Sequence, residues 1–257
     1  IMQSVVDLVG VSSVVKRILT NAAGAIVGMT EIGAEVGHGE RPMVGITCMG
    51  VTTPAALAIT SLLEARGYET VLFHGATEPL EYMLEKGWID GVIDLTSNEL
   101  IDLHIYCAPN RPMPRQDRLE IVGRKGLPWI TIPGTLDFGF FPLDDPRFKG
   151  RRVSKHGPTI FLVRTTKEEM KELGKAVAER AKKAEGPVTV VIPLRGFSAV
   201  DKEGQELYNP EADQAFTDAV KENAEKNMSV IEVHAHINDK EFAEKVVEIF
   251  DNMFKKK

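Results

Sequence analysis

Short apolar runs and amphipathic segments alternate along most of the chain. The first run, residues 42–49, is bounded by proline and glycine and has the length and composition of a buried strand. Further runs of the same character are residues 68–74, 91–96, 129–132, 158–164, 187–194 and 230–236. Segments with apolar residues at helical spacing separate most of these runs. The alternation predicts an α/β fold with a doubly wound, mostly parallel, Rossmann-like sheet and helices on both faces.

The start of the chain has a different pattern. Apolar residues recur at helical spacing through residues 4–36, and a tract of small residues, 21–28, lies inside this stretch. We expect residues 1–41 to form a helical and linker segment that packs on the domain or on a partner subunit, because its apolar side needs a cover. Residues 42–257 are then expected to form a single α/β domain, and residues 4–36 to mediate a homodimer.

The turn after the first strand has features of an anion-binding site. Gly50 begins the turn, Thr53 stands where a helix N-cap is expected, and Pro54 follows at the first helical position. A strand, a glycine turn and a helix N-terminus together offer backbone N–H groups to an anion. The spacings GxGxxG and GxxxxGK[ST] are absent here, so an ordinary turn between a strand and a helix is the alternative interpretation.

Ligands of open α/β sheets bind outside the carboxyl ends of the strands. The residues at the predicted strand ends that we expect to bind a ligand are Gly50, Thr52, Thr53, His74, Arg164, Thr165, Thr166, Arg195 and Ser198. Two arginines and several hydroxyl groups at one edge favour a small anionic ligand, such as a phosphate, a nucleotide or a carboxylate.

No catalytic residue follows from the sequence, and whether the protein is an enzyme stays open. Asp137, His236 and Asp239 are candidates for acid–base chemistry, each with a structural role as the alternative. His234 and His236 would share one face of a strand, but no third ligand stands at a recognisable spacing, so we predict no metal site. Ser198 is a weak candidate for a nucleophile because no G-x-S-x-G motif is present.

Composition excludes several partners. The chain has 257 residues and a net charge of −6, which argues against nucleic acid and anionic membranes because both require a basic face. Its two cysteines are too few for a disulfide framework and indicate a reducing, cytoplasmic location. We see no apolar run of membrane-spanning length and no signal-peptide pattern.

Several collinear motifs resemble those of a known family. They are residues 21–29, 41–55, 134–138, 164–166, 193–198 and 236–239. They are similar to the uncharacterised two-domain family of bacterial, fungal and plant proteins whose plant member contains the inhibitory region of the tomato mosaic virus resistance protein. The resemblance covers nearly the whole chain, and this chain looks like the linker and the C-terminal half.

The resemblance implies further expectations. An N-terminal α/β half would complete the protein, and the family is described as nucleotide-binding, with an ATP site associated mainly with that first half. The residues alone identify no cofactor, and we expect no ATP hydrolysis by this domain. The plant relative suggests an alternative function as a protein-interaction or inhibitory module, with the aromatic loop 138–148 offering exposed apolar contacts. The chain departs from the family pattern at residues 75–79, where the glycine-rich turn is shortened, and at residues 104–116.

Overall fold

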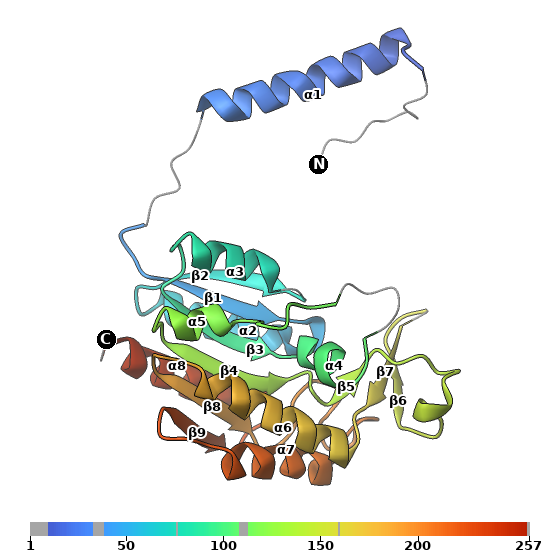
Figure 1. Cartoon of the computed structure of the whole chain (residues 1–257), viewed down its shortest axis with the longest axis vertical. Helices are drawn as coiled ribbons and strands as arrows, with labels where there is room; N and C mark the ends of the chain where they lie inside the picture. Colours follow the sequence, from blue (N-terminus) through green and yellow to red (C-terminus); the bar gives the residue numbers. More distant parts are fainter. Residues whose placement is uncertain (1–9, 33–38, 76, 108–112, 159, 256–257) are drawn as a thin grey trace. The chain divides into compact units, whose positions relative to one another are not determined.

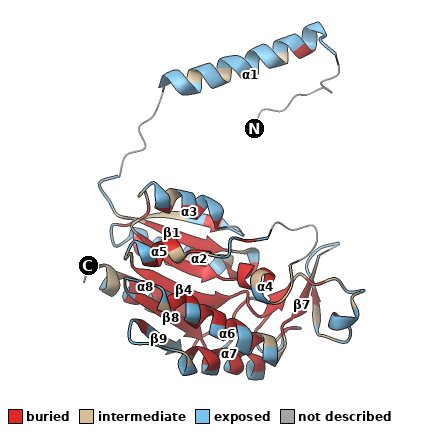
Figure 2. Cartoon of the chain, viewed as in Figure 1, coloured by how far each residue is buried: buried red, intermediate tan, exposed pale blue. Residues whose placement is uncertain are grey.

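The computed structural model describes residues 10–32, 39–75, 77–107, 113–158 and 160–255, and the chain divides into two units, Ile1–His38 and Gly39–Lys257. The described part of the first unit contains helix α1 (Ser13–Ile32). Figure 2 shows that most residues of this helix are exposed. Its exposed large apolar residues are Val14, Leu19, Ile26, Val27, Met29 and Ile32.

A six-stranded sheet forms the centre of the second unit, and each pair of neighbouring strands is parallel (Figure 1). In spatial order its strands are β2 (Glu69–His74), β1 (Met43–Cys48), β3 (Gly91–Thr96), β4 (Trp129–Gly134), β8 (Val188–Pro193) and β9 (Met228–Val233). Most residues of the four inner strands are buried, as expected for a sheet covered on both faces.

Helices cover both faces of this sheet. Helices α2 (Thr53–Glu64) and α8 (Lys240–Lys255) pack on one face, in a core that contains Ile46, Ile93 and Ile130. The other face carries α3 (Glu78–Glu85), α4 (Glu99–His104), α5 (Glu120–Arg124), α6 (Lys167–Lys182) and α7 (Pro210–Glu222). Val92 and Trp129, which adjoin Ile93 and Ile130 in sequence, belong to this second core because successive side chains of a strand point to opposite faces. The predicted doubly wound α/β fold is confirmed.

A small second sheet corrects one part of the prediction. Strands β5 (Phe138–Gly139), β7 (Phe161–Arg164) and β6 (Val153–Lys155) pair antiparallel, with β7 in the middle. The apolar run 158–164 therefore does not belong to the parallel sheet. A parallel strand needs a long crossover, usually an α-helix. Between β4 and β7 the only helix of the described chain is the short 3-10 helix η2 (Pro146–Phe148), and β7 pairs with β5 and β6 instead of joining the main sheet.

The aromatic side chains of the loop 138–148 are mostly buried, whereas Leu143 is exposed, so the prediction of exposed apolar contacts there holds for Leu143 but not for most of the aromatic rings. Phe138, Phe141 and Phe148 are each at most 5% exposed. Phe141 and Phe148 stack with their ring centroids 4.3 Å apart, and Tyr106 meets both rings edge-on. These rings anchor the loop to the domain instead of presenting it to a partner.

Two helix starts are set by the local backbone conformation. Helix α5 begins at Glu120, because Leu119 adopts a left-handed backbone conformation with φ 56°. The N-cap of α2 is Thr52 instead of Thr53, since residues Gly50–Thr52 form a 3-10 turn, η1, directly before the helix.

Candidate functional site at the strand ends

The strand order places a topological switch point between β1 and β3. β2 lies on one side of β1, whereas β3, β4, β8 and β9 follow on the other side. The connections after β1 and β3 therefore leave in opposite directions, and the carboxyl ends of these two strands border the crevice where open α/β sheets bind ligands.

The turn after β1 uses its hydroxyl groups internally. Thr52 Oγ1 accepts a hydrogen bond from Met49 N at 3.1 Å and donates one to Met49 O at 3.0 Å. Thr53 Oγ1 donates to the same carbonyl at 3.2 Å. Gly50 is exposed with open space around its Cβ position, and the backbone N–H groups of Gly50 and Val51 have no acceptor among the described residues. The turn therefore has backbone N–H groups available to a ligand, while the hydroxyl groups of Thr52 and Thr53 stabilise the turn through internal hydrogen bonds.

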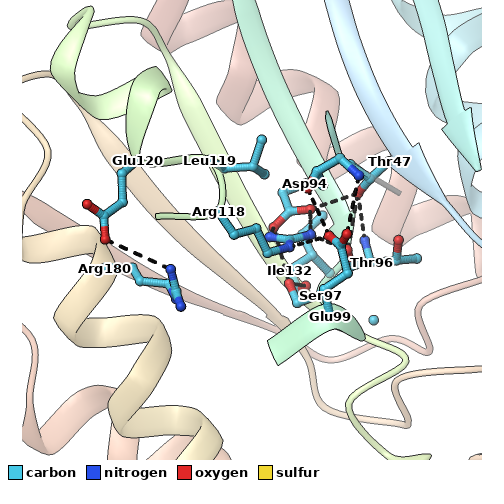
Figure 3. Close-up of polar contacts among 12 residues, drawn as sticks. Thr47, Asp94, Thr96, Ser97, Glu99, Arg118, Leu119, Glu120, Ile132 and Arg180 are labelled. Atoms are coloured by element: carbon cyan, nitrogen blue, oxygen red, sulfur yellow. Dashed lines mark hydrogen bonds and ion pairs between the residues drawn. The ribbon is translucent and has the colours of Figure 1, made fainter. Parts of the chain in front are cut away.

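Beneath the switch point lies a buried charge network centred on Arg118 (Figure 3). Its guanidinium donates to both carboxylate oxygens of Asp94, at 2.7 and 2.9 Å, and to Glu99 at 2.6 Å. Thr47 Oγ1 donates to Asp94 at 2.8 Å, and Thr77 Oγ1 donates to Glu99 at 3.0 Å. Burial alone would lower the pKa of Arg118, but the two carboxylates outweigh it and raise the pKa above its ordinary value.

A small hollow lies at this network. Its lining includes Thr47, Met49, Gly75, Thr77, Thr96, Asn98, Glu99 and Arg118, and its volume is about 10 Å³. That volume holds about one water molecule, so a larger ligand would have to lie above the network. The amide nitrogen of Asn98 donates to Thr135 O and Phe138 O, while its Oδ1 is buried without a hydrogen-bond partner among the described residues.

A second polar cluster joins the turn after β4 to the loop after β8. Ser198 Oγ donates to Asp137 Oδ2 at 2.7 Å. Arg164, at the end of β7, donates to the backbone carbonyl of Asp137 at 2.9 Å and to the carboxylate of Asp213 on α7. Asp201 lies 3.8 Å from the same guanidinium. The predicted ligand residue Arg164 is therefore buried and committed to internal partners.

The carboxyl groups of this cluster are perturbed. Burial, together with the charge of Asp201, raises the pKa of Asp137 to about 7. Burial also raises the pKa of Asp213 well above its ordinary value, with Asp201 adding to the effect. These shifts reflect acidic groups held in the interior against one arginine.

His236 serves the backbone of the same region. Its ring Nε2 lies 2.9 Å from Ser198 O, and its Nδ1 accepts a hydrogen bond from Asn238 N at 3.1 Å, so Nε2 carries the proton. Burial lowers the pKa of His236. The imidazole therefore contacts the carbonyl of Ser198 and not its hydroxyl, and the arrangement is not that of a base that activates a serine. Asp239 accepts from His236 N at 2.8 Å.

The two histidines of the last predicted strand are separated. β9 ends at Val233, so His234 and His236 lie in the following turn, where the alternation of a strand does not apply. His234 is exposed, whereas His236 is buried. Among the described residues no group of three or more His, Cys, Asp or Glu side chains has the arrangement of a metal site.

Three loops join into one edge around the turn after β1. Val51 O accepts from Ala199 N at 3.0 Å and from Asn238 Nδ2 at 2.9 Å. Asn238 Oδ1 in turn accepts from Ala55 N at 3.2 Å, in the first turn of α2. The loops after β1, β8 and β9, which carry separate sequence motifs, therefore hold one another in place.

The predicted ligand residues divide into two groups. Gly50, His74 and Arg195 are exposed at the strand ends, and Thr53 is half-buried. The second group forms internal hydrogen bonds that hold the backbone in place, and it consists of Thr52, Arg164, Thr165, Thr166 and Ser198. Thr165 Oγ1, for example, donates to Leu136 O, and Thr166 forms a capping box with Glu169.

The network around Arg118 was missed because Arg118 lies in a turn and not at a strand end. One signal pointed to it: Asp94 interrupts the apolar strand 91–96, and a carboxylate in a buried strand requires a partner.

Comparison with known proteins gives two matches to one family. Residues 41–254 match the C-terminal domain of the Uncharacterised protein family (UPF0261). Residues 1–35 match the N-terminal domain of the same family, so the segment interpreted as a linker belongs by sequence to the first domain. No helix in the described part of the chain has both the length and the apolar character needed to cross a bilayer.

Individual relatives agree with this assignment. A UPF0261 protein of Clostridium tetani is 36% identical over 260 residues, which cover 98% of this chain and 64% of the relative. The ToMV resistance protein Tm-1(GCR237) of Solanum lycopersicum is 34% identical over 96% of this chain and 34% of its own length. The ToMV susceptible protein tm-1(GCR26) of the same plant is also 34% identical, over 97% of this chain and 34% of its own length. The chain thus belongs to the uncharacterised protein family UPF0261, with a C-terminal domain at residues 41–254 and part of an N-terminal domain at residues 1–35.

Proposed function

We propose that the domain binds a small anionic ligand at the turn after β1. The observation that carries this proposal is the position of Gly50 and Val51: their backbone N–H groups lack an acceptor among the described residues, directly before the N-terminus of α2 and at the switch point of the sheet. Such a helix end carries a partial positive charge that attracts anions.

The charges below the turn restrict where the anion binds. Asp94 and Glu99 together outnumber the single positive charge of Arg118, so the floor of the hollow does not attract a second anion. The anionic group therefore binds at the backbone turn, and Arg195 is the exposed arginine among the predicted ligand residues. Phosphate, nucleotide and carboxylate ligands all fit this description, and ATP enters as a candidate through the family resemblance.

A matched pair of variants at Gly50 tests the proposal. Gly50→Ala keeps the backbone N–H and meets open space, whereas Gly50→Pro removes that N–H at a position where it has no internal acceptor. We expect phosphate or ATP to raise the thermal midpoint of the wild type and of Gly50→Ala, and to raise it clearly less in Gly50→Pro. Equal shifts in both variants would remove the turn from the site, and Arg195→Ala measures the contribution of the arginine.

A protein-interaction or inhibitory module is the second candidate function. It rests on the printed name of the tomato resistance protein, yet the susceptible protein is equally similar to this chain. The burial of Phe138, Phe141 and Phe148 leaves the half-buried Phe140 and the exposed Leu143 as the large apolar side chains that the loop 138–148 can offer to a partner. If removing that loop left partner capture intact but abolished ligand binding, the loop would have no docking role.

We also propose that α1 mediates a homodimer. Val11, Val15, Ile18, Ala22, Ala25, Met29 and Ile32 alternate at spacings of four and three residues. This is the pattern of a helix that packs along a second helix, and the two alanines allow a close approach. The N-terminal half found in the longer relatives is the competing cover for this stripe.

We propose that the protein is located in the cytoplasm. Cys48 is a buried free thiol, and burial raises its pKa, which fits a protein kept in a reducing compartment.

A further inference from the structure

The interior of the domain contains an excess of acidic groups around Arg164. Asp137, Asp201 and Asp213 come from the turn after β4, the loop after β8 and helix α7, and each is at most 9% exposed. One guanidinium, that of Arg164, faces all of them electrostatically. Three ionised carboxylates would leave this region with an excess negative charge, which is costly away from water.

The hydrogen bonds show which carboxyl group is least stabilised as an anion. Asp213 receives a charged hydrogen bond from Arg164. Asp201 accepts from the backbone of Phe197 at 3.0 Å and lies 3.8 Å from Arg164. The carboxyl group of Asp137 receives only neutral donors, the hydroxyl of Ser198 and the backbone N–H of Asp137 itself, and its Oδ1 is buried without a partner among the described residues. Burial raises the pKa of Asp213 as well, but Arg164 donates a charged hydrogen bond to that carboxylate and none to the carboxylate of Asp137. Asp137 is therefore the group that we expect to hold the proton.

We propose that Asp137 and Ser198 form a proton-controlled latch between the turn after β4 and the loop after β8. Asp137 is protonated while the Ser198 loop is closed over it, and it loses the proton to solvent when the loop opens. The latch is separate from ligand binding, but it acts on the same edge, because Ala199 of this loop donates to Val51 O in the turn after β1.

The other charged groups around the Ser198 loop do not prevent Asp137 from being protonated in the closed state. His236 contacts Ser198 O from the loop after β9, and burial lowers its pKa, so it is neutral near pH 7. Asp239, Asp201 and Lys202 act on His236 only as weaker charges. Arg164 is the positive group next to Asp137, and burial together with Asp201 still raises the pKa of Asp137 to about 7.

The sign of the pH dependence follows from these states. An opened loop returns Asp137 to water, where its pKa falls to about 4. The closed state therefore binds more protons than the open state between about pH 4 and pH 7. The opening equilibrium constant should rise up to about tenfold per pH unit across this window and level off above it, so acid favours the closed latch.

Two measurements on the full chain test the latch. Infrared spectroscopy should detect a protonated carboxyl group at pH 6 that disappears above pH 8 and is missing in Asp137→Asn. Hydrogen exchange of residues 196–201, corrected for the intrinsic pH dependence of exchange, should give an opening constant that rises with pH in the wild type and stays flat in Asp137→Asn. Asp144→Asn is the matched control, because it removes one exposed carboxylate from the same β4–β7 connection.

A second variant keeps the test decisive if Asp137→Asn does not fold. Ser198→Ala removes the side-chain hydrogen bond that stabilises ionised Asp137, so the carboxyl signal should persist to a higher pH than in the wild type. The proposal fails if the wild type shows no protonated carboxyl signal at pH 6. It also fails if Asp137→Asn retains the pH-dependent opening, or if Ser198→Ala leaves the titration unchanged.

Discussion

Asn238 accepts a hydrogen bond from the backbone of Ala55, 183 positions away in the sequence, and so caps helix α2 from a different loop. The same side chain donates to Val51 O at 2.9 Å. Asn238 therefore ties the N-terminus of α2 to the turn that the ligand is proposed to contact.

Replacing Asn238 should loosen this edge. Asn238→Ala removes both hydrogen bonds, and we expect the free energy of unfolding to fall by about 1 to 3 kcal/mol, measured by urea denaturation. Gln214→Ala is the control, since Gln214 makes an exposed hydrogen bond to Asp218 within one helix and should cost less than about 0.5 kcal/mol. Similar losses in the two variants would show that the Asn238 bridge adds no stability.

Arg118 should be among the most sensitive positions of the fold. Arg118→Met leaves Asp94 and Glu99 buried without their positive partner, and the expected loss is about 3 to 5 kcal/mol. The double variant Arg118→Met with Asp94→Asn removes one unpaired charge and should recover part of that loss. Arg124→Ala, at a half-exposed arginine 3.8 Å from Asp117, is the control and should change stability by less than about 1 kcal/mol. A small effect of Arg118→Met would contradict the importance of the network.

The contrast between Arg118 and Arg164 shows what the sequence allowed us to predict. The strand-end rule placed Gly50, Asp137, Ser198 and His236 after strands, and in the structure they lie in the connections that follow strands of the main sheet. It did not separate exposed arginines from buried ones. Arg164 was expected to bind a ligand, but its partner Asp213 lies on α7, 49 residues later in the chain, and no local pattern reveals that pairing.

The fold was predictable where the spacing of apolar residues and the length of the connections between strands indicate the same arrangement. Each strand of the main sheet is an apolar run with a helix between it and the next, so the parallel order follows from the pattern. β7 has the same apolar character, but it pairs antiparallel with β5 and β6. Because β5 has two residues and β6 has three, neither strand is long enough to be recognised in the sequence by alternation of apolar and polar residues.

His236 should make the domain sensitive to acid. Burial lowers its pKa, although the hydrogen bond to Ser198 O opposes this, so the folded chain binds the proton at a lower pH than the unfolded chain does. The contribution to stability is present above about pH 6.5 and is lost as the pH falls through the lowered pKa of the folded state. Urea denaturation at several pH values should show a smaller acid loss in His236→Gln than in the wild type. His234→Gln, at an exposed histidine, should leave the profile unchanged, and equal profiles for all three proteins would contradict the prediction.

The stripe on α1 predicts a defined oligomer. Light scattering of the full chain at micromolar concentration should give the mass of a dimer, because the stripe through Ile18, Ala22 and Ala25 has the spacing of a helix that packs along a second helix. Ile18→Glu with Ala25→Glu should give a monomer, whereas Thr20→Glu, outside the stripe, should remain dimeric. A monomeric wild type would overturn the homodimer and favour the N-terminal half of the family as the cover of α1.

ATP, if it binds, should not be hydrolysed by this chain. Phosphoryl transfer requires a phosphate cradle with a lysine or arginine clamp and a magnesium ion held by a carboxylate. Thr52 and Thr53 direct their hydroxyl groups to Met49 O, and no lysine follows them in the first turn of α2. Asp94 and Glu99, the carboxylates beneath the turn, are bound to Arg118 and leave no free pair for magnesium in the described part of the site. A phosphate-release assay with magnesium and ATP should therefore stay at the background rate. Magnesium-dependent release that disappears in the double variant Thr52→Ala, Thr53→Ala would show that the turn is a catalytic cradle after all.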